Sequence, residues 1–395
     1  MGIQGRYTEA AELQERIYEM TLLGREHSIH LSAMTNLGNT YWSQGRFAQA
    51  AQLQEKTLAA TRTVQGDDHV DTLVAMSNLG NTYWSQERFT EAVQLHEKAS
   101  SAMRTTLGEC HFDTLTAMIN LGNDYRCLGK LKQAVDLQEN ALTLLEKLLG
   151  ENHCDTLNAM FNLGITYESQ GRFTEAATLL QKTLAARTTQ DENHSDTLIT
   201  MMNLGNIFWS QGRFAEAAEL HERTVSGMKR VFGEDHFDTL TAMINLGNDY
   251  RCQFKWKEAT DLQENAMILL ERLLGEDHPD TLNAMTHVGA VYRDQGRLAD
   301  AIDLQEKTRV ACERVLDDDH ELTLEVMNDL GMTYCLEGRF EEAVELHTMT
   351  LATRERVLGA GHPDVLQTYC RRYTASRTII SVKVDWKMQP GCKVM

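Results

Sequence analysis

Apolar residues recur along the chain in two alternating helical patterns. The first pattern runs from about Thr72 to Ser85. With Met76 placed at 0° around an α-helix, Leu79, Gly80 and Tyr83 lie at about 300°, 40° and 340°, which makes one stripe. A second amphipathic segment extends from about residue 90 to 107. Between them stands "QER", which is "QGR" in other copies, where glycine supplies the backbone angles of a turn. The pattern predicts a helical hairpin.

The hairpin pattern returns with an almost constant period. Histidines mark it at positions 27, 69, 111, 153, 194, 236, 278, 320 and 362, and every step is 42 residues except the step of 41 that ends at His194. A fixed period of this size is typical of a solenoid. Because one hairpin cannot bury its apolar face alone, neighbouring hairpins must stack. The segment 111–127 recurs unchanged at 236–252, which indicates growth by copying blocks of three hairpins.

The period divides the chain into four parts. Residues 1–26 hold the second helix of a partial repeat, 27–361 eight 42-residue repeats, and 362–372 the start of a degenerate ninth. The last segment, 373–395, matches no repeat, and we expect it to be a poorly ordered tail. Since solenoids normally end in polar caps, these ends favour a chain that belongs to a larger architecture.

Composition supports helices and narrows the partners. The 395 residues include only three prolines, and 42% are apolar, enough for a packed interior. The net charge of −19 argues against nucleic acid or an anionic membrane as the main partner. No spanning helix or signal peptide is predicted, and eight cysteines without CxxC spacing indicate reduced thiols. We therefore expect a cytoplasmic protein.

The spacing of Leu79, Gly80, Tyr83, Ala92 and Ala99 resembles the tetratricopeptide repeat. The 42-residue period and the pattern "HPDTL…G.Y..QGR..EA..L" resemble the kinesin-light-chain variety of this repeat. Similar arrays occur in nephrocystin-like proteins and in NLR-type receptors of fungi and bacteria. The resemblance covers residues 4–372. It implies an all-α fold, a right-handed α-solenoid in which the first helices line a concave groove.

The candidate binding residues lie opposite the apolar stripe. Val74, Asn78, Asn81 and Ser85 fall at about 160°, 200°, 140° and 180°. The resemblance implies that this polar stripe faces the groove. An asparagine amide both donates and accepts, so it can pair with the backbone of an extended peptide. The ladder comprises Asn36, Asn39, Asn78, Asn81, Asn120, Asn123, Asn162, Asn203, Asn206, Asn245 and Asn248, with Arg126 and Arg251 beside it.

Alternatives remain for these positions. The first asparagine of each hairpin could instead bond a neighbouring helix and order the stack. The arginines could hold acidic groups of a partner or form intramolecular ion pairs. Trp42, Trp84 and Trp209, between core and groove, could pack between first helices or face a partner.

No catalytic or metal-binding constellation is predicted. Equivalent loop histidines of stacked hairpins should lie about 10 Å apart, whereas zinc needs ligands at about 2 Å. The chain has no HExxH, no GxSxG, no GxGxxG after a strand and no cysteine with a motif-supported base. We expect no metal, no cofactor and no enzyme.

The prediction is a non-catalytic interaction scaffold that binds an extended peptide or partner segment in the groove. Kinesin light chains carry an N-terminal heptad coiled coil, which this sequence lacks, so a sensor array of an NLR-type receptor system is favoured over a cargo adaptor. The GxxxxGK[ST] loop of those receptors is absent as well. The rival prediction is an architectural role, with self-association through the repeat ends.

Overall fold

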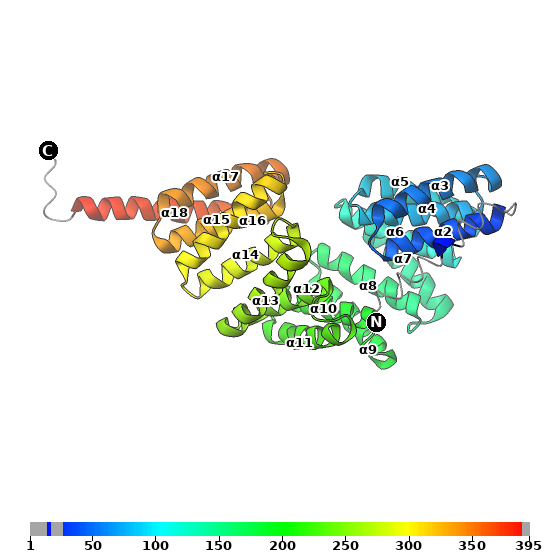
Figure 1. The fold of residues 1–395 in the computed structure, drawn as a ribbon, viewed down its shortest axis with the longest axis horizontal. Coiled ribbons are helices and arrows are strands. Elements are labelled where there is room, and N and C mark those ends of the chain that lie inside the picture. Colours follow the sequence, from blue (N-terminus) through cyan, green and yellow to red (C-terminus); the bar gives the residue numbers. More distant parts are fainter. Residues whose placement is uncertain (1–13, 17–26, 389–395) are drawn as a thin grey trace. The chain divides into compact units, whose positions relative to one another are not determined.

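The computed structural model describes residues 14–16 and 27–388, and helices alternate along this part of the chain (Figure 1). The first helices of the hairpins are α2 (His27–Ser43), α4 (Val70–Ser85), α6 (Phe112–Cys127), α8 (Cys154–Ser169), α10 (Ser195–Ser210), α12 (Phe237–Cys252), α14 (Pro279–Asp294), α16 (Glu321–Glu337) and α18 (Pro363–Met388). The second helices are α3 (Phe47–Gln65), α5 (Phe89–Thr106), α7 (Leu131–Leu149), α9 (Phe173–Gln190), α11 (Phe214–Val231), α13 (Trp256–Leu274), α15 (Leu298–Val315) and α17 (Phe340–Leu358).

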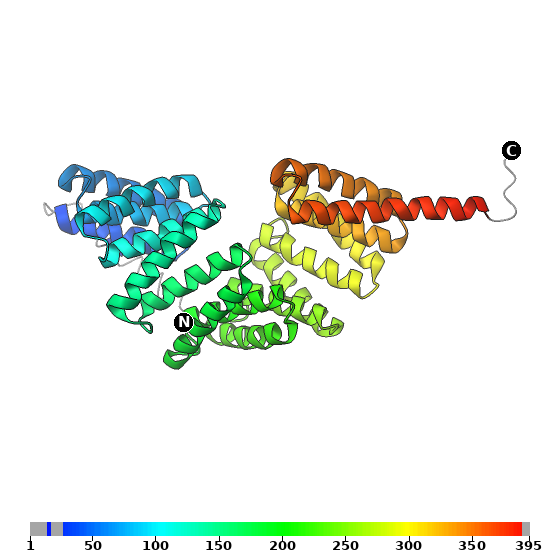
Figure 2. The same ribbon diagram turned by 180° about the vertical axis from the view of Figure 1, so that it is seen from behind.

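The helices form two compact units, Met1–Gln211 and Gly212–Met395. Within the first unit each helix packs on the next, and the first helices α2, α4, α6, α8 and α10 also contact one another in sequence. The second unit repeats this arrangement with α12, α14, α16 and α18 (Figures 1 and 2). Each unit is therefore an α-solenoid of stacked hairpins, which confirms the predicted all-α fold.

Histidine begins the first helices by capping them. Nδ1 of His69 accepts a hydrogen bond from the backbone N–H of Asp71 at 3.2 Å, and this satisfies a donor that the helix end leaves open. The same contact starts every later first helix, from α6 to α18. The periodic histidines thus have a structural role.

The hairpin turn requires a residue in the left-handed region. Gly45 and Gly171 take φ of 72° and 75° there, which glycine adopts at no steric cost. Glu87 stands at the same place in its hairpin with φ of 61°, and Phe254 takes 61° in another. These two turns keep the geometry but carry a side chain that disfavours it.

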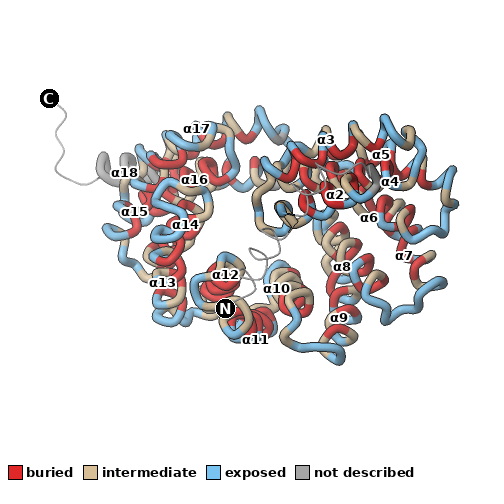
Figure 3. Tube along the Cα trace, turned by 45° about the vertical axis from the view of Figure 1, so that its right-hand side comes forward, coloured by how far each residue is buried: buried red, intermediate tan, exposed pale blue. Residues whose placement is uncertain are grey.

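The core lies where the apolar stripe predicts it. Leu73, Met76 and Leu79 of α4 are buried, as are their equivalents in α2, α6, α8, α10, α12, α14 and α16 (Figure 3). In α18 the equivalent residues Leu366 and Tyr369 are exposed. Gly80 makes room for a side chain of the second helix rather than for its backbone, because a Cβ there would lie 2.5 Å from His96 Nε2.

The chain ends are described in part. The helix α18 continues past Arg372 as far as Met388, and the poor order expected of segment 373–395 stays a prediction. Of the partial repeat at 1–26 the structure describes only 14–16, which is helical. No described helix is both long enough and apolar enough to cross a bilayer.

Candidate functional site

The predicted polar stripe lies on the face that the first helices turn away from the core, here called the first-helix face. Its asparagines are exposed or half-buried, whereas Leu79 and Gly80 on the other side of α4 are buried. Contacts between successive first helices bring the stripe together within each unit. The first unit carries nine of its asparagines: Asn36, Asn39, Asn78, Asn81, Asn120, Asn123, Asn162, Asn203 and Asn206. The second unit carries Asn245 and Asn248.

The first asparagine of a hairpin is used differently along the array. Nδ2 of Asn162 donates to the carbonyl of Asn158 at 2.8 Å, and Asn203 makes the equivalent bond to Ile199, also at 2.8 Å. Asn78 and Asn120 make no side-chain hydrogen bond to any residue that the structure describes. Their amides are half-buried and available to a ligand.

The second asparagine has a partner that the sequence did not predict. A buried glutamine of the second helix donates from Nε2 to its Oδ1: Gln54 to Asn39 at 3.4 Å, Gln138 to Asn123 at 2.9 Å and Gln263 to Asn248 at 2.9 Å. Asn81 belongs to a hairpin with His96 in place of glutamine, and it has no side-chain partner in the described part of the chain.

One contact links the stripe across hairpins. Nδ2 of Asn123 donates to Oδ1 of Asn162 at 3.0 Å, so a second asparagine bonds the first asparagine of the next hairpin. At this pair the two asparagines therefore join neighbouring hairpins, which is the stack-ordering alternative. Because Nδ2 carries two hydrogens, one donor of Asn123 is left over.

The positions beside the stripe make intramolecular contacts. Trp42 Nε1 donates to Ser85 Oγ at 2.8 Å, although the Trp42 side chain keeps 42% of its surface exposed. In the second unit Arg251 pairs with Asp294 at 3.0 Å, and Arg293 lies 3.3 Å from Asp329. These ion pairs favour the intramolecular alternative for the arginines of that unit.

In the first unit Arg126 stands at the position of Arg251, and Glu168 stands at the position of Arg293. Burial raises the pKa of the Glu168 carboxyl, and the positive charge of Arg126 lowers it in part. The Arg126 Nε is buried without a hydrogen-bond partner in the part of the chain that is described. Arg126 thus remains the predicted site residue with most unused donor capacity in this unit.

Two buried histidine–aspartate pairs between hairpins escaped the sequence-based prediction. His96 Nδ1 lies 2.6 Å from Asp124 Oδ2, and His221 Nδ1 lies 2.6 Å from Asp249 Oδ2, with all four side chains at most 1% exposed. Burial raises the pKa of Asp124, and the hydrogen bond and charge of His96 oppose that rise. The signal was present in the sequence, because histidine occurs with aspartate 28 residues later in both copies.

The arginine that follows the hairpin turn, as Arg172 follows Gly171, supports the scaffold. Arg172 stacks on Tyr167 at 3.9 Å from the ring centroid and pairs with Glu175 at 2.5 Å. The hydroxyl of Tyr167 donates to Glu139 of the preceding second helix at 2.6 Å. Burial, and then the hydrogen bond with Glu139, raises the pKa of Tyr167 to about 12. This interlock joins successive hairpins on the side away from the asparagines.

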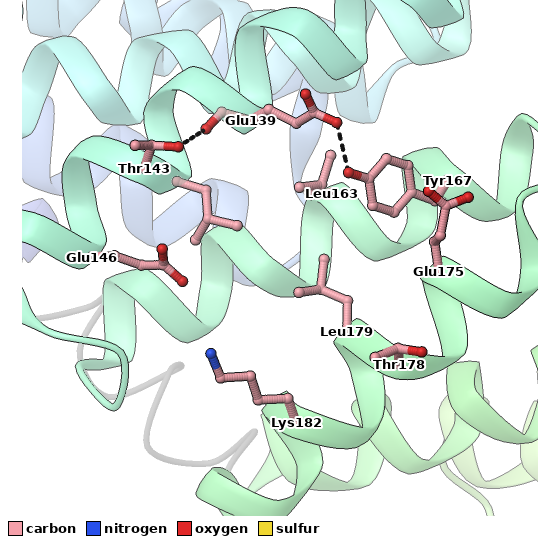
Figure 4. A pocket seen from close by; sticks show the side chains of 10 residues that line it. Glu139, Thr143, Glu146, Leu163, Tyr167, Glu175, Thr178, Leu179 and Lys182 are labelled. Carbon is pink, nitrogen blue, oxygen red and sulfur yellow. Dashed lines mark hydrogen bonds between the residues drawn. The ribbon is translucent and has the colours of Figure 1, made fainter.

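Two hollows of the described surface lie on that other side as well. One of about 480 Å³ opens between α7 and α9 above α8, with Leu163 and Leu179 in it and Glu139, Glu175 and Lys182 around it (Figure 4). The equivalent hollow two hairpins earlier measures about 450 Å³. The carboxylates Glu139 and Glu175 are already engaged by Tyr167 and Arg172. None of the predicted site residues lines either hollow.

Three potential metal ligands meet at one helix start. Side-chain atoms of His153, Cys154 and Asp155 lie within 4.8 Å of one another. His153 Nδ1 already accepts from the backbone N–H of Asp155, as the other capping histidines do. The cluster is a variant of the cap and gives no ground for assigning a metal.

A protein with this fold and this polar face belongs to the class of helical-hairpin solenoids. Within that class the chain belongs to the tetratricopeptide repeat family, which matches residues 30–71, 52–105, 113–189, 196–264, 247–309 and 283–356. The predicted family is confirmed. Proteins of this family are generally non-catalytic scaffolds for protein–protein interaction. No protein of curated function matches the sequence.

Several solved structures are similar to this chain. The apo form of the quorum sensor NprR from B. thuringiensis is 14% identical over 89% of this chain and 97% of its own, with a TM-score of 0.63. A STAND protein with a tetratricopeptide repeat sensor from Pyrococcus horikoshii is 15% identical over 89% of this chain and 54% of its own, with a TM-score of 0.59. A putative kinesin light chain from "Podosopora anserina" is 24% identical over 51% and 95%, with a TM-score of 0.47.

Proposed function

We propose that the chain is an interaction scaffold that binds an extended peptide or partner segment in a groove along the first-helix face. The observation that carries the proposal is the set of unused amides on α4 and α6. The side chains of Asn78, Asn81 and Asn120 are half-buried and bond no described side chain or backbone group. Half-buried amides without partners are costly unless water or a ligand satisfies them.

The chemistry of this face suits a peptide backbone. The stripe of the first unit consists of asparagine, serine, threonine and apolar residues without formal charge, in a chain of net charge −19. Carboxamides pair with N–H and C=O groups of any sequence, whereas ion pairs would select charged side chains. The expected ligand is therefore an uncharged, extended segment read mainly through its backbone.

The experiment is selection from a random library of uncharged dodecapeptides displayed on phage. The affinity of an enriched peptide is then compared between wild type and Asn78→Ala/Asn81→Ala/Asn120→Ala. Losing about three hydrogen bonds should weaken binding at least tenfold. The matched control, Gln94→Ala/Thr143→Ala/Thr178→Ala, changes exposed second-helix residues and should bind as wild type. Equal affinity of the asparagine variant for every enriched peptide would falsify the proposal.

Within this function we favour a sensor array over a cargo adaptor. A structure with the same fold belongs to a STAND protein with a tetratricopeptide repeat sensor, and another belongs to a Rap protein complexed with the Competence and Sporulation Factor, 12% identical with a TM-score of 0.57. Sequencing the gene around this coding region tests this choice. An in-frame nucleotide-binding domain supports the sensor array, whereas a heptad coiled coil supports the cargo adaptor. Sedimentation over a range of concentrations tests the architectural alternative, which requires self-association.

A further inference from the structure

Buried glutamines of the second helices stand directly behind the asparagines of the first-helix face. Gln54, Gln138 and Gln263 are at most 3% exposed. Each packs on the glycine of its own first helix, where an added Cβ would lie 2.4–3.0 Å from the glutamine Cγ. From this position each glutamine reaches the second asparagine of its hairpin.

The direction of these hydrogen bonds is fixed in one hairpin by a backbone carbonyl. Nε2 of Gln263 donates to the Ile244 carbonyl at 3.1 Å as well as to Asn248 Oδ1 at 2.9 Å. A carbonyl only accepts, so the nitrogen of Gln263 must lie on this side. Asn248 therefore turns its oxygen to the core and its Nδ2 donors outward.

The next hairpin holds the other end of the glutamine. The Thr166 hydroxyl donates to Gln138 Oε1 at 2.6 Å, and the Thr82 hydroxyl donates to Gln54 Oε1 at 2.5 Å. A glutamine bonded at both ends cannot turn over without breaking these bonds. In these two hairpins the orientation of the asparagine is thus set by stacking on the next hairpin. Val291 stands at the place of the threonine for Gln263, whose Oε1 has no partner among the described residues, so Gln263 is held by the Ile244 carbonyl alone.

The chain contains its own comparison positions. His96 replaces the glutamine behind Asn81, and its ring bonds Asp124 and the Ser77 carbonyl, which leaves Asn81 unheld. Ala290 replaces the asparagine in front of Gln305, whose Nε2 is then buried without a partner among the described residues. Glutamine and asparagine therefore act as a pair.

We propose that Gln54, Gln138 and Gln263 are positioning residues that hold Asn39, Asn123 and Asn248 as hydrogen-bond donors toward the carbonyl oxygens of a bound extended peptide. The proposal rests on the proposed function and adds the polarity of recognition. Hairpins with glutamine present a donor, whereas the hairpin with His96 leaves Asn81 free to donate or accept. A ligand of the first unit is expected to turn carbonyl groups toward α2 and α6, and a ligand of the second unit, taken by itself, toward α12.

The test converts one glutamine hairpin into the histidine type. Gln138→His/Thr166→Asp copies the His96–Asp124 pair, which already stacks two hairpins of this chain. We expect the thermal midpoint to change by no more than about 2 °C, while affinity for the library-selected peptide falls about two- to tenfold. The reciprocal variant His96→Gln/Asp124→Thr should hold Asn81 and raise the affinity. Wild-type affinity in both variants would overturn the proposal and leave the proposed function intact.

A second measurement needs no ligand. The side-chain amide of Asn123, observed by ¹⁵N relaxation in the full-length chain, should be as rigid as the helix backbone in wild type and mobile in Gln138→His/Thr166→Asp. The side-chain amide of Asn203, which donates to the Ile199 carbonyl and does not contact Asn123, should stay unchanged as an internal control. An equally rigid Asn123 in both proteins contradicts the positioning role, even if the library yields no peptide and the proposed function fails.

Discussion

Single positions decide how each hairpin uses its polar residues. Helical angles assign Leu79 to the core and Asn78 and Asn81 to the opposite face, and the structure agrees. They do not show which polar residues meet, because Gln54 and Thr82 are 28 residues apart and belong to different hairpins. The recurrence of Gln with Thr and of His with Asp at this offset is the signal that would have predicted these pairs.

Glu87 offers a test at the turn. The φ of 61° at Glu87 disfavours any residue with a Cβ. Glu87→Gly places there the residue that Gly45 and Gly171 supply in other hairpins, so it is expected to stabilise the protein by about 0.5–1 kcal/mol. Urea unfolding measures the change. Glu87→Ala keeps the Cβ and serves as the control, so equal effects of the two substitutions would contradict this explanation.

His347 provides a pH-dependent prediction. It is buried, neither ring nitrogen has a partner among the described residues, and burial followed by the charge of Arg371 lowers its pKa to about 4. The unfolded chain, with a histidine pKa near 6.5, binds the proton first, so stability is lost as pH falls from about 6.5 toward 4.

Replacing His347 should remove that loss. His347→Leu, which copies Leu180 at the equivalent position, should lose about 2 kcal/mol less stability than wild type between pH 7 and pH 5. Denaturant unfolding at the two pH values gives the comparison. Parallel pH dependence of the two proteins would show that His347 is not buried as a neutral group.

Pairs of helices set the order of stacking. Behind the glycines of the first helices, the second helices carry Gln, His or Leu. The next first helix carries Thr after Gln54, Gln138 and Gln305, Asp after His96 and His221, and Ile, Val or Ala in the remaining hairpins. The hairpins, their boundaries and the copied blocks followed from period and pattern alone. The continuation of α18 to Met388 did not, because residues 373–388 match no repeat.

A double-mutant cycle tests this pairing. Thr166→Asp alone buries a carboxylate opposite Gln138 and should cost about 3 kcal/mol. Adding Gln138→His should recover most of that loss, with a coupling energy above about 1 kcal/mol. Unfolding free energies of the four proteins give the coupling, and additive effects would mean that the 28-residue offset carries no pairing.

A single substitution should also complete the ladder in the second unit. Ala290→Asn supplies an acceptor for the orphaned Nε2 of Gln305 and is expected to add about 0.5–1.5 kcal/mol. Ala290→Leu adds volume without an acceptor and should destabilise. Unfolding in urea distinguishes the two, and equal losses from both would mean that the position tolerates no larger side chain.

At the scale of the molecule, the negative charge of the chain lies outside the polar stripe of the first unit. The chain carries −19 overall, yet the stripe of the first unit has no formal charge apart from Arg126 and Glu168 beside it. This property of the stripe depends only on residue type and helical angle. The identity of a ligand did not follow, since amides that read a backbone do not specify side chains.

The most direct test of the account is to locate a bound peptide on the array. A peptide selected from the uncharged library carries a nitroxide label, and NMR detects which amides of the protein lose signal. The account predicts broadening along the first helices α4 and α6 and its disappearance in Asn78→Ala/Asn81→Ala/Asn120→Ala. Broadening centred on the hollow between α7 and α9, unchanged in that variant, would contradict it.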